Sequence, residues 1–198
     1  MTTRGRHEIT RDDIVDMERY GRERAKRRGR VTAIKKLRRL EVGPFATFYF
    51  ESFETMLHQV HEMLHIEGGG EDQIPGEIEA YNPLVPQGKE LVATVMLEIE
   101  DPVRRARLLA KLGGIEETAT ITVGGTTVTG VPEADLDRTT AAGKASAVQF
   151  IHFPFTDAQI AAFGETGAQV VVGFAHPAYG HMAVMPEATR AALAEDFD

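Results

Sequence analysis

The chain has 198 residues, of which 42% are hydrophobic and 26% charged, and its formal net charge is −8. This length and composition are typical of a globular protein that buries a core without covalent staples. The absence of cysteine excludes disulfides, thiol catalysis and an iron–sulfur cluster held by the chain's own thiolates. No apolar run approaches the ~20 residues of a membrane span and no signal-peptide pattern opens the chain, so we expect a cytoplasmic protein without a membrane span.

The charge is distributed very unevenly along the chain. Residues 1–41 carry a net charge of +7 and the remaining residues one of −15. A basic segment of this kind either packs across the acidic body of its own chain or docks an acidic partner. No aromatic or glycine motif of an RNA- or DNA-binding module accompanies the charge, which disfavours nucleic acid. The candidate partner-docking residues are Arg27, Arg28, Lys35 and Arg39.

The basic segment is predicted to form two helices and then a strand. Thr10 is a typical helix N-cap, acidic residues follow it and Gly29 provides a stop, which predicts a helix over residues 10–29. Apolar residues at helical spacing predict a second helix over residues 30–40, broken by Gly43-Pro44. The aromatic run at residues 45–50 predicts a β-strand.

Residues 54–67 read as one amphipathic helix, around which we expect the fold to be organised. The apolar side consists of Met56, Leu57, Val60, Met63 and Leu64. The opposite, polar side consists of Glu54, His58, His61, Glu62 and His65. The first side needs a core to pack on, and the second is an unusual solvent face because it gathers three imidazoles and two carboxylates.

The polar side of this helix is a candidate metal site. Glu62-x-x-His65 matches the Glu-x-x-His pattern of di-iron helical bundles, with His58 on the same face and Glu77 or Glu79 as a further carboxylate. Imidazole and carboxylate ligands suit Fe, Mn or Zn. Two alternatives remain open, a plain polar solvent face and a surface for a partner.

A short helix is predicted over residues 74–81, followed by an irregular segment at 82–86. Tyr81 and Asn82 come directly before Pro83 and offer a buriable phenol and an amide. A hydrogen bond from Asn82 to loop backbone is favoured over contact with a ligand.

From residue 90 onward the chain reads as two β-α-β-β units, at about residues 91–131 and 147–185, joined by residues 135–146. The fragments V-G-G…G-V-P-E-A and V-G-F…V-M-P-E-A recur in the same order. This pattern predicts an α+β fold with an N-terminal helical layer and a mostly antiparallel sheet that carries helices on one face. We expect residues 1–86 and 87–198 to form a single compact domain.

The second unit is longer than the first by an insertion at residues 175–181, which we expect on a hairpin tip. His176 and His181 flank a tight turn there, with Tyr179 between them as a candidate ligand contact. If the organising helix meets this hairpin, Glu62, His176 and His181 form the two-His, one-carboxylate triad that suits non-haem Fe(II). The alternative is a rigid turn with polar tips.

Several of these fragments resemble an uncharacterised bacterial family, domain-of-unknown-function family 3501, over nearly the whole chain. They are Arg38-x-x-x-x-Gly43-Pro44, Phe50-Glu51, Gln59-x-x-Glu62-Met63, Ala80-Tyr81-Asn82-Pro83-Leu84, Ser146-Ala147-Val148 and His176-Pro177-x-Tyr179-x-His181. The resemblance carries no established activity. It implies that family members are neighbours of rubrerythrin-like di-iron proteins and of heterodisulfide-reductase-like iron–sulfur proteins. A supporting role in redox metabolism or peroxide defence is the expectation that follows.

Three functions follow as expectations. The first is an accessory protein that docks redox partners, an iron–sulfur protein or a rubrerythrin-like protein, through the basic N-terminal helices. The second is a non-haem metal oxidoreductase that uses Glu62, His176 and His181, with His58 and His65. The third and weakest is an RNA-associated module. No nucleophile-elbow motif or other hydrolase signature occurs in the sequence.

Overall fold

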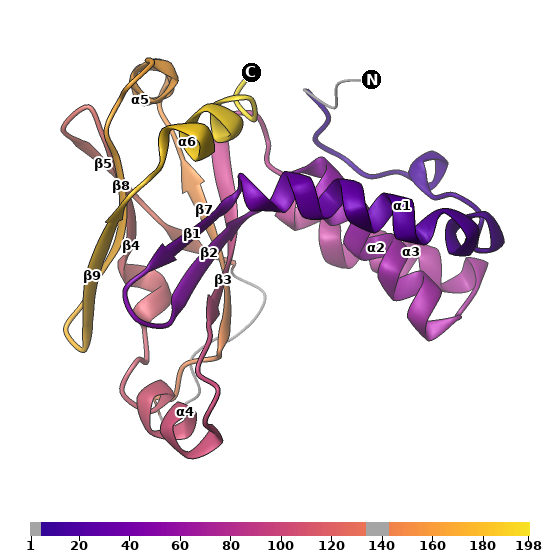
Figure 1. Cartoon of the computed structure of the whole chain (residues 1–198), viewed down its shortest axis with the longest axis horizontal. Helices are drawn as coiled ribbons and strands as arrows, with labels where there is room; N and C mark the ends of the chain where they lie inside the picture. Colours follow the sequence, from indigo (N-terminus) through magenta and orange to yellow (C-terminus); the bar gives the residue numbers. More distant parts are fainter. Residues whose placement is uncertain (1–4, 134–142) are drawn as a thin grey trace.

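The computed structural model describes residues 5–133 and 143–198 and has an α+β fold. Three helices, α1 (Met17–Lys36), α2 (Phe53–Glu67) and α3 (Ile74–Tyr81), form an arm beside the β-sheets (Figure 1). Three shorter helices, α4 (Pro102–Leu109), α5 (Asp157–Gly164) and α6 (Glu187–Ala194), lie around the sheets. Within the described part of the chain, no helix combines the length and apolar character that a membrane span requires.

The strands pair antiparallel throughout but form two sheets rather than the single sheet expected. The first sheet has the order β1 (Arg39–Val42), β2 (Ala46–Phe50), β3 (Glu90–Leu97), β7 (Val148–Pro154) and β6 (Val131–Pro132). The second has the order β5 (Thr126–Thr129), β4 (Ala119–Val123), β8 (Val170–His176) and β9 (Tyr179–Val184). Strands β1 and β2 come from the N-terminal region and complete a sheet with the repeats.

The duplication is confirmed, because β3-α4-β4-β5 and β7-α5-β8-β9 follow the same order. Each unit gives its first strand to the first sheet and its hairpin to the second, so that β3 pairs with β7 and β4 with β8. The unit helices do not lie on one face: α5 and α4 close opposite ends of the space between the sheets (Figure 1). Their apolar side chains, Leu109 and Phe163, join the core there.

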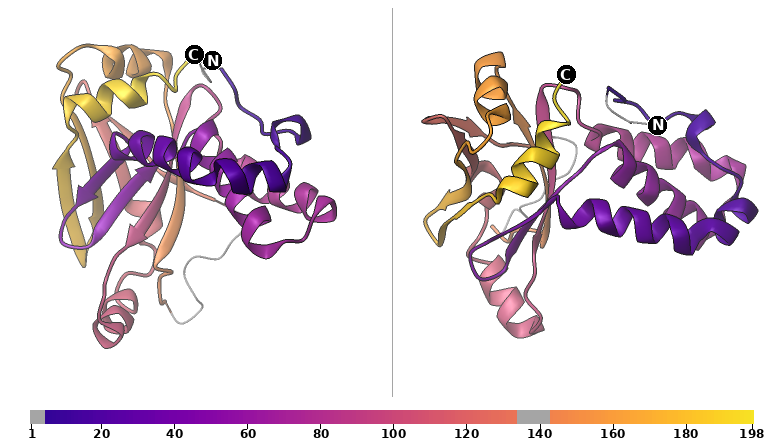
Figure 2. Two further views of the ribbon diagram at one scale, coloured as in Figure 1. Left: turned by 45° about the vertical axis from the view of Figure 1, so that its right-hand side comes forward. Right: turned by 45° about the horizontal axis from the view of Figure 1, so that its top comes forward.

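Two hydrophobic cores result. The larger lies between the sheets and includes Phe48, Ile121 and Val172. The smaller lies under the arm, where Val60 and other residues of α2 contact the outer face of the first sheet at Val92. The amphipathic helix is therefore confirmed, with Met56, Val60 and Leu64 buried. Figure 2 shows from two further sides how the arm projects from the sheets.

The N-terminal helices differ from the prediction. One helix, α1, replaces the two expected; it begins after Asp16, whose carboxylate caps the Arg19 N–H at 3.0 Å, and it passes through Gly29. A glycine inside a helix costs only about 1 kcal/mol, which the packing of α1 on α2 outweighs. Residues 39–42, predicted to be partly helical, form strand β1 instead.

The insertion in the second unit lies at the tip of the β8–β9 hairpin, as expected. Strand β8 continues to His176 and β9 starts at Tyr179, so the extra residues lengthen the paired strands. Of the predicted linker at residues 135–146, residues 135–142 lie outside the described residues.

Candidate functional site

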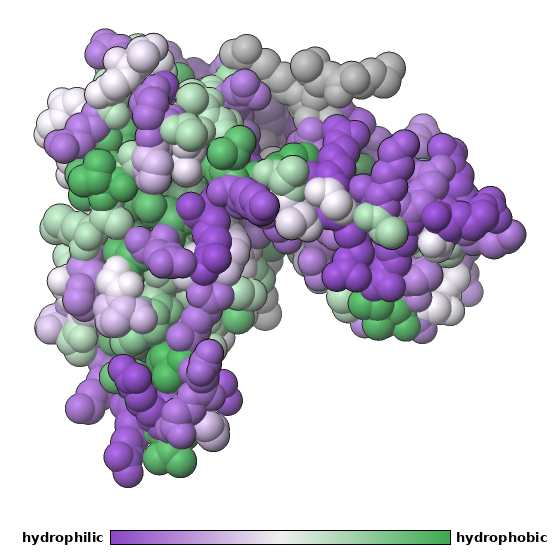
Figure 3. All heavy atoms as spheres, viewed as in Figure 1, coloured by the Kyte–Doolittle hydropathy of each residue, from purple (hydrophilic) through white to green (hydrophobic). Residues whose placement is uncertain are grey.

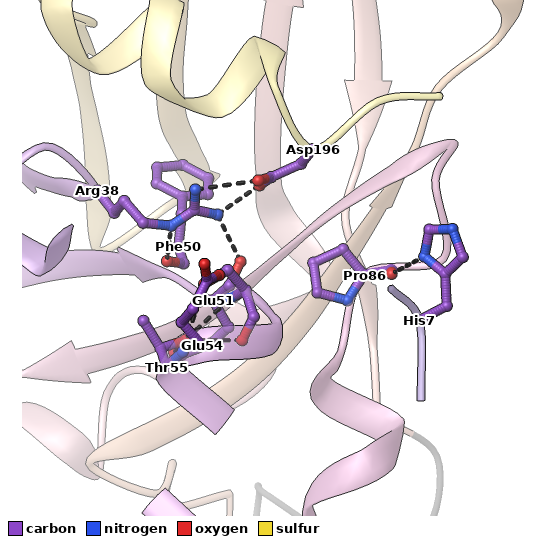
Figure 4. A network of polar contacts seen from close by, with 9 residues as sticks. His7, Arg38, Phe50, Glu51, Glu54, Thr55, Pro86 and Asp196 are labelled. Carbon is purple, nitrogen blue, oxygen red and sulfur yellow. Dashed lines mark hydrogen bonds and ion pairs between the residues drawn. The ribbon is translucent and has the colours of Figure 1, made fainter. Parts of the chain in front are cut away.

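Arg38 is the centre of a buried polar network between α1, α2 and α6 (Figure 4). Its guanidinium donates to the backbone oxygens of Phe50 at 2.9 Å and Glu51 at 2.6 Å, and it forms a two-point ion pair with Asp196, Nη1 to Oδ1 at 3.0 Å. Burial raises the pKa of Asp196, and the charge of Arg38 opposes that rise. Four of the five guanidinium N–H groups are thus committed within the chain.

Glu51 extends this network into the first sheet. Its carboxylate accepts hydrogen bonds from the hydroxyls of Thr55 at 2.6 Å and Thr94 at 2.7 Å, and all three side chains are buried. Thr55 also closes the capping box of α2 with Ser52. The network therefore fixes the N-terminus of α2 to strand β3 and to the end of α1.

A pocket of about 460 Å³ opens beside this network. Its lining comes from the N-terminal segment, the end of α1, the start of α2, the loop before β3 and the end of α6: Gly5, Arg6, His7, Ile34, Leu37, Arg38, Ser52, Phe53, Glu54, Pro86, Ala192, Glu195 and Asp196. This volume is within the usual range for a small-molecule site. The lining contains one hydroxyl, that of Ser52, and it serves as the α2 cap. We therefore assign no nucleophile–base pair to the pocket.

The N-terminal segment forms one wall of the pocket. The ring nitrogens of His7 lie 2.7 Å from the Pro86 carbonyl and 3.0 Å from the Asp198 carboxylate. The Arg6 guanidinium lies 4.1 Å from the centre of the Phe53 ring and pairs with Asp13 at 2.6 Å. The cations of the pocket are thus occupied by groups of the chain itself.

His61 does not belong to a solvent face, as the helical projection suggested. It is buried, its ring stacks on Tyr20 at 4.9 Å, Nε2 accepts the Val15 N–H at 3.1 Å and Nδ1 donates to Leu57 O at 2.8 Å. Burial lowers its pKa to about 4. The expectation was wrong because α1 covers this side of α2.

Glu62, His58 and His65 also lie along the contact between α1 and α2. Glu62 accepts from Arg24 at 2.9 and 2.8 Å and from the Tyr20 hydroxyl at 2.7 Å, and the Arg24 bond lowers its pKa to about 2. His58 Nδ1 is 3.3 Å from the same hydroxyl, and burial lowers the pKa of His58. The His65 ring meets the Tyr20 ring edge-on at 5.7 Å. Glu62 and His58 are thus hydrogen-bonded to Tyr20 or Arg24 of α1, and His65 packs against Tyr20.

The hairpin tip clamps the β1–β2 turn. The Tyr179 hydroxyl donates to Val42 O at 2.8 Å and accepts the N–H groups of Phe45 at 3.2 Å and Ala46 at 3.0 Å. The His181 ring lies against Tyr179 at 4.5 Å and beside Gly43, whose φ is +72°.

His176 Nε2 donates to Gly113 O at 3.2 Å, while Nδ1 accepts the Ala178 N–H at 3.1 Å. The two histidines therefore bond and pack within the chain.

The structure does not bring together the proposed triad. Glu62 is in the helical arm, whereas His176 and His181 are on the β8–β9 hairpin at the other side of the sheets (Figure 1). Across residues 5–133 and 143–198, no group of three or more His, Cys, Asp or Glu side chains is arranged to hold a metal ion.

Asn82 clamps the N-terminal segment, because its amide accepts the Ile9 N–H at 2.8 Å and donates to Ile9 O at 3.0 Å. Tyr81 is half-buried, and burial raises its pKa. The predicted hydrogen bonding of Asn82 to loop backbone is thus made to Ile9.

Of the four predicted docking residues, two form ion pairs within the chain and two do not. Arg27 pairs with Glu23 at 2.7 Å, and Arg39 pairs with Glu41 at 2.8 Å and stacks near Tyr49 at 5.6 Å. Arg28 and Lys35 have no ion-pair partner within the described ranges.

Sequence reasoning missed His7, Asp196 and the contacts of His152. The His152 ring bridges two carboxylates, Nδ1 to Glu90 at 3.0 Å and Nε2 to Glu133 at 2.9 Å, and these bonds raise its pKa. Arg38 and Glu51 did stand among the family-like fragments. The ion-pair partner of Arg38, Asp196, carried no signal, because it lies 158 residues away in the sequence.

A solved structure resembles this chain closely. It is the crystal structure of a novel protein of unknown function from Burkholderia pseudomallei K96243, with 38% sequence identity, a TM-score of 0.89, and coverage of 96% of this chain and 99% of that one. A comparison with curated proteins gave no match. The family described as "Protein of unknown function (DUF3501)" matches residues 8–197, in agreement with the resemblance noted in the sequence. The chain belongs to this family.

Proposed function

We propose that the chain is an accessory protein that docks an acidic protein partner through the exposed side of α1. The observation that carries the proposal is the charge of this helix: nine Lys and Arg against two Glu in 20 residues. A surface helix with so large an excess of positive charge favours an anionic partner and speeds its encounter.

Only part of this charge is neutralised within the chain. Arg19 and Arg27 pair with Glu23, Arg22 pairs with Glu18, and Arg24 pairs with Glu62. A second set has no ion-pair partner among the described residues, and all but the half-buried Lys35 are exposed: Lys26, Arg28, Arg30, Lys35 and Lys36, here called the basic face. Figure 3 shows α1 as predominantly hydrophilic on the side that faces the viewer.

The shape of α1 suits close approach by a partner. Ala25, Gly29 and Ala33 recur every four residues, so they share one side of the helix, and all three are exposed. Lys26 and Arg30 lie on one flank of this stripe and Arg28 lies on the other. Small residues let another backbone come near, and cations on both flanks then meet its carboxylates.

The resemblance stated above supplies the partner class, an iron–sulfur protein or a rubrerythrin-like protein. The test is binding of a purified rubrerythrin-like protein and of a heterodisulfide-reductase-like iron–sulfur protein from the same organism, measured by biolayer interferometry at two salt concentrations. The variant Lys26→Glu/Arg28→Glu/Arg30→Glu is expected to weaken binding at least tenfold, since three attractive charges become repulsive (about 0.5 kcal/mol or more each).

The matched control is Arg104→Glu/Arg107→Glu/Lys111→Glu, which makes the same charge change on and just after α4, away from the arm. Equal weakening by both triple variants would mean that only net charge matters and would refute a specific face. A filter-binding titration with single-stranded RNA tests the weaker alternative, an RNA-associated module. If the chain binds RNA tightly, with a strong salt dependence, and the α1 variant does not, the partner of the basic face is RNA and not a protein.

A further inference from the structure

The pocket beside Arg38 has an excess of negative charge among its described residues. Its lining includes three carboxylates, one from the start of α2 and two from the end of α6: Glu54, Glu195 and Asp196. The two guanidinium groups of the lining are balanced within the chain, Arg38 by Asp196 and Arg6 by Asp13. Glu195 is exposed and has no ion-pair partner in the described part of the chain. Carboxylate charge therefore remains for a cation that enters the pocket.

The three carboxylates of the lining act on one another. Burial raises the pKa of Asp196, the charge of Arg38 opposes that rise, and the charges of Glu54 and Glu195 add to it. Figure 4 shows Asp196 and Glu54, which come from the ends of different helices, near the Arg38 guanidinium. Because solvent screens charges less in a partly buried site, a cation bound here is attracted more strongly than at an open surface.

The chemistry of the lining favours an organic cation over a metal ion. Among residues 5–133 and 143–198, no three His, Cys, Asp or Glu side chains are arranged to hold a metal ion, so the three carboxylates do not converge on one point. The rest of the lining is largely apolar and includes Ile34, Leu37, Phe53, Pro86 and Ala192. Leu37 is 47% exposed at this site. A carbon chain with a charged nitrogen at its end can cover these side chains and still reach a carboxylate.

The chain itself places a cation of this kind at the pocket wall. The Arg6 guanidinium, at the end of an aliphatic side chain, lies 4.1 Å from the centre of the Phe53 ring. A guanidinium at this distance is attracted by the face of the ring. Arg6 lines the pocket without filling it, and a cavity of about 460 Å³ remains beside it. The lining thus accommodates a guanidinium beside an aromatic ring, which indicates the class of ligand.

We infer that the pocket binds a small organic cation, an aliphatic amine or guanidine, with its nitrogen at Glu195 and its carbon chain against Leu37 and Ala192. A charge-assisted hydrogen bond from the N–H group to the carboxylate holds the charged end of such a ligand. Burial of its CH₂ groups against the apolar lining holds the remainder. The inference does not rest on the basic face of α1, since none of the residues of that face lines the pocket.

Isothermal titration calorimetry at low salt is the direct test, with agmatine as the guanidine probe and spermidine as the amine probe. Dissociation constants between about 10 μM and 1 mM are expected, because the site offers few ion pairs and remains partly open to water. Citrate, an anionic probe, is expected not to bind. A chain that binds neither cationic probe at about 10 mM, or that binds citrate more tightly than both, would overturn the inference.

Two variants test whether the probe binds in the pocket. Glu54→Gln/Glu195→Gln removes two carboxylates of the lining and is expected to weaken binding at least about fivefold. Ala192→Phe places a ring in the cavity and is expected to weaken binding at least about tenfold in a chain that circular dichroism shows to be folded. If Ala192→Phe does not fold, the double variant decides the question alone.

The matched control is Glu100→Gln/Glu117→Gln, which neutralises two exposed carboxylates that do not line the pocket. It is expected to leave the dissociation constant within about twofold of the wild-type value, because distant exposed charges are screened. Equal weakening by the two double variants would mean that only net charge attracts the probe, and it would overturn the inference. Wild-type affinity in a folded Ala192→Phe variant would also overturn it, since the probe would then bind elsewhere.

Discussion

The hairpins of the two repeated units follow the same order of elements but differ in length and in contacts. The β4–β5 hairpin turns at Gly124-Gly125 after five residues and is short. The β8–β9 hairpin is longer, and its tip reaches the β1–β2 turn through Tyr179 and His181. The extra length thus attaches the second sheet to the first, a structural use for residues that resembled a metal site in the sequence.

The largest expected effect is on the free energy of unfolding when a glycine at the tip contact of the longer hairpin and one in the turn of the shorter hairpin are each replaced by alanine. Gly43 has φ +72° and lies under the clamp, where a Cβ would stand 2.6 Å from the His181 ring; Gly125 has φ +77° and open space around it. Gly43→Ala is expected to lower the free energy of unfolding by about 3 kcal/mol, and Gly125→Ala by about 1 kcal/mol.

Urea denaturation of both variants checks this difference. Equal losses would mean that backbone conformation alone sets the cost and that the clamp contributes nothing at Gly43.

The second prediction removes one hydroxyl from each hairpin. Tyr179→Phe removes three hydrogen bonds, one to the Val42 carbonyl and two from the backbone N–H groups of Phe45 and Ala46, and it is expected to lower the free energy of unfolding by about 2 kcal/mol. Thr127→Val removes one exposed hydroxyl and its hydrogen bond to Thr122, and it is expected to cost less than about 0.5 kcal/mol. Thermal melts followed by circular dichroism measure both, and a Tyr179→Phe variant as stable as the wild type would contradict the clamp.

A third prediction concerns pH and the contact between the two units at β3 and β7. Hydrogen bonds from His152 to Glu90 and to Glu133 raise its pKa in the folded chain above the ~6.5 of an unfolded histidine. Its contribution is therefore fully present below about pH 6.5 and is lost as the pH rises through the folded-state value. His152→Gln is expected to cost about 1 kcal/mol at about pH 6 and progressively less toward about pH 9.

Denaturation at several pH values gives this profile for the wild type and the variant. A loss that stays constant over the whole range would show that His152 acts by packing and not by its charge.

The smallest expected effect is on metal content. The described residues include no group of three or more candidate metal ligands. Because a tight site would fill during growth in iron- or zinc-supplemented medium, purified protein is expected to hold less than ~0.1 metal ion per chain. The variant His176→Ala/His181→Ala is expected to have the same low content. Plasma emission spectroscopy measures the content. About one ion per chain, lost in the double variant, would restore the metal interpretation of the longer hairpin.

Local patterns predicted the local parts of this fold. Residues 74–81 have the predicted helix, and the recurring fragments V-G-G…G-V-P-E-A and V-G-F…V-M-P-E-A located the repeated units. The helical spacing of Met56, Val60 and Leu64 predicted a buried side of α2. These features depend on residues a few positions apart, which a sequence displays directly.

The predictions that failed concern features that depend on which distant segments pack against a residue. A helical projection places His61 opposite the core but cannot show that α1 covers that side with Tyr20. Strand alternation identifies the inward residues of β4 and β8 but not which sheet they join. The ion pair of Arg38 with Asp196 spans 158 residues, and no helix was predicted at the end of the chain, so the sequence offered no sign of it.

This separation has a consequence for biosynthesis. Arg38 is made long before Asp196, so during translation the α1–β1 junction carries a cation whose counter-ion does not yet exist. The arm can form its helices early, but the buried guanidinium is neutralised only when α6 has emerged and folded back. Nascent chains arrested before residue 196 would therefore keep this junction open to water and exposed to proteases and chaperones.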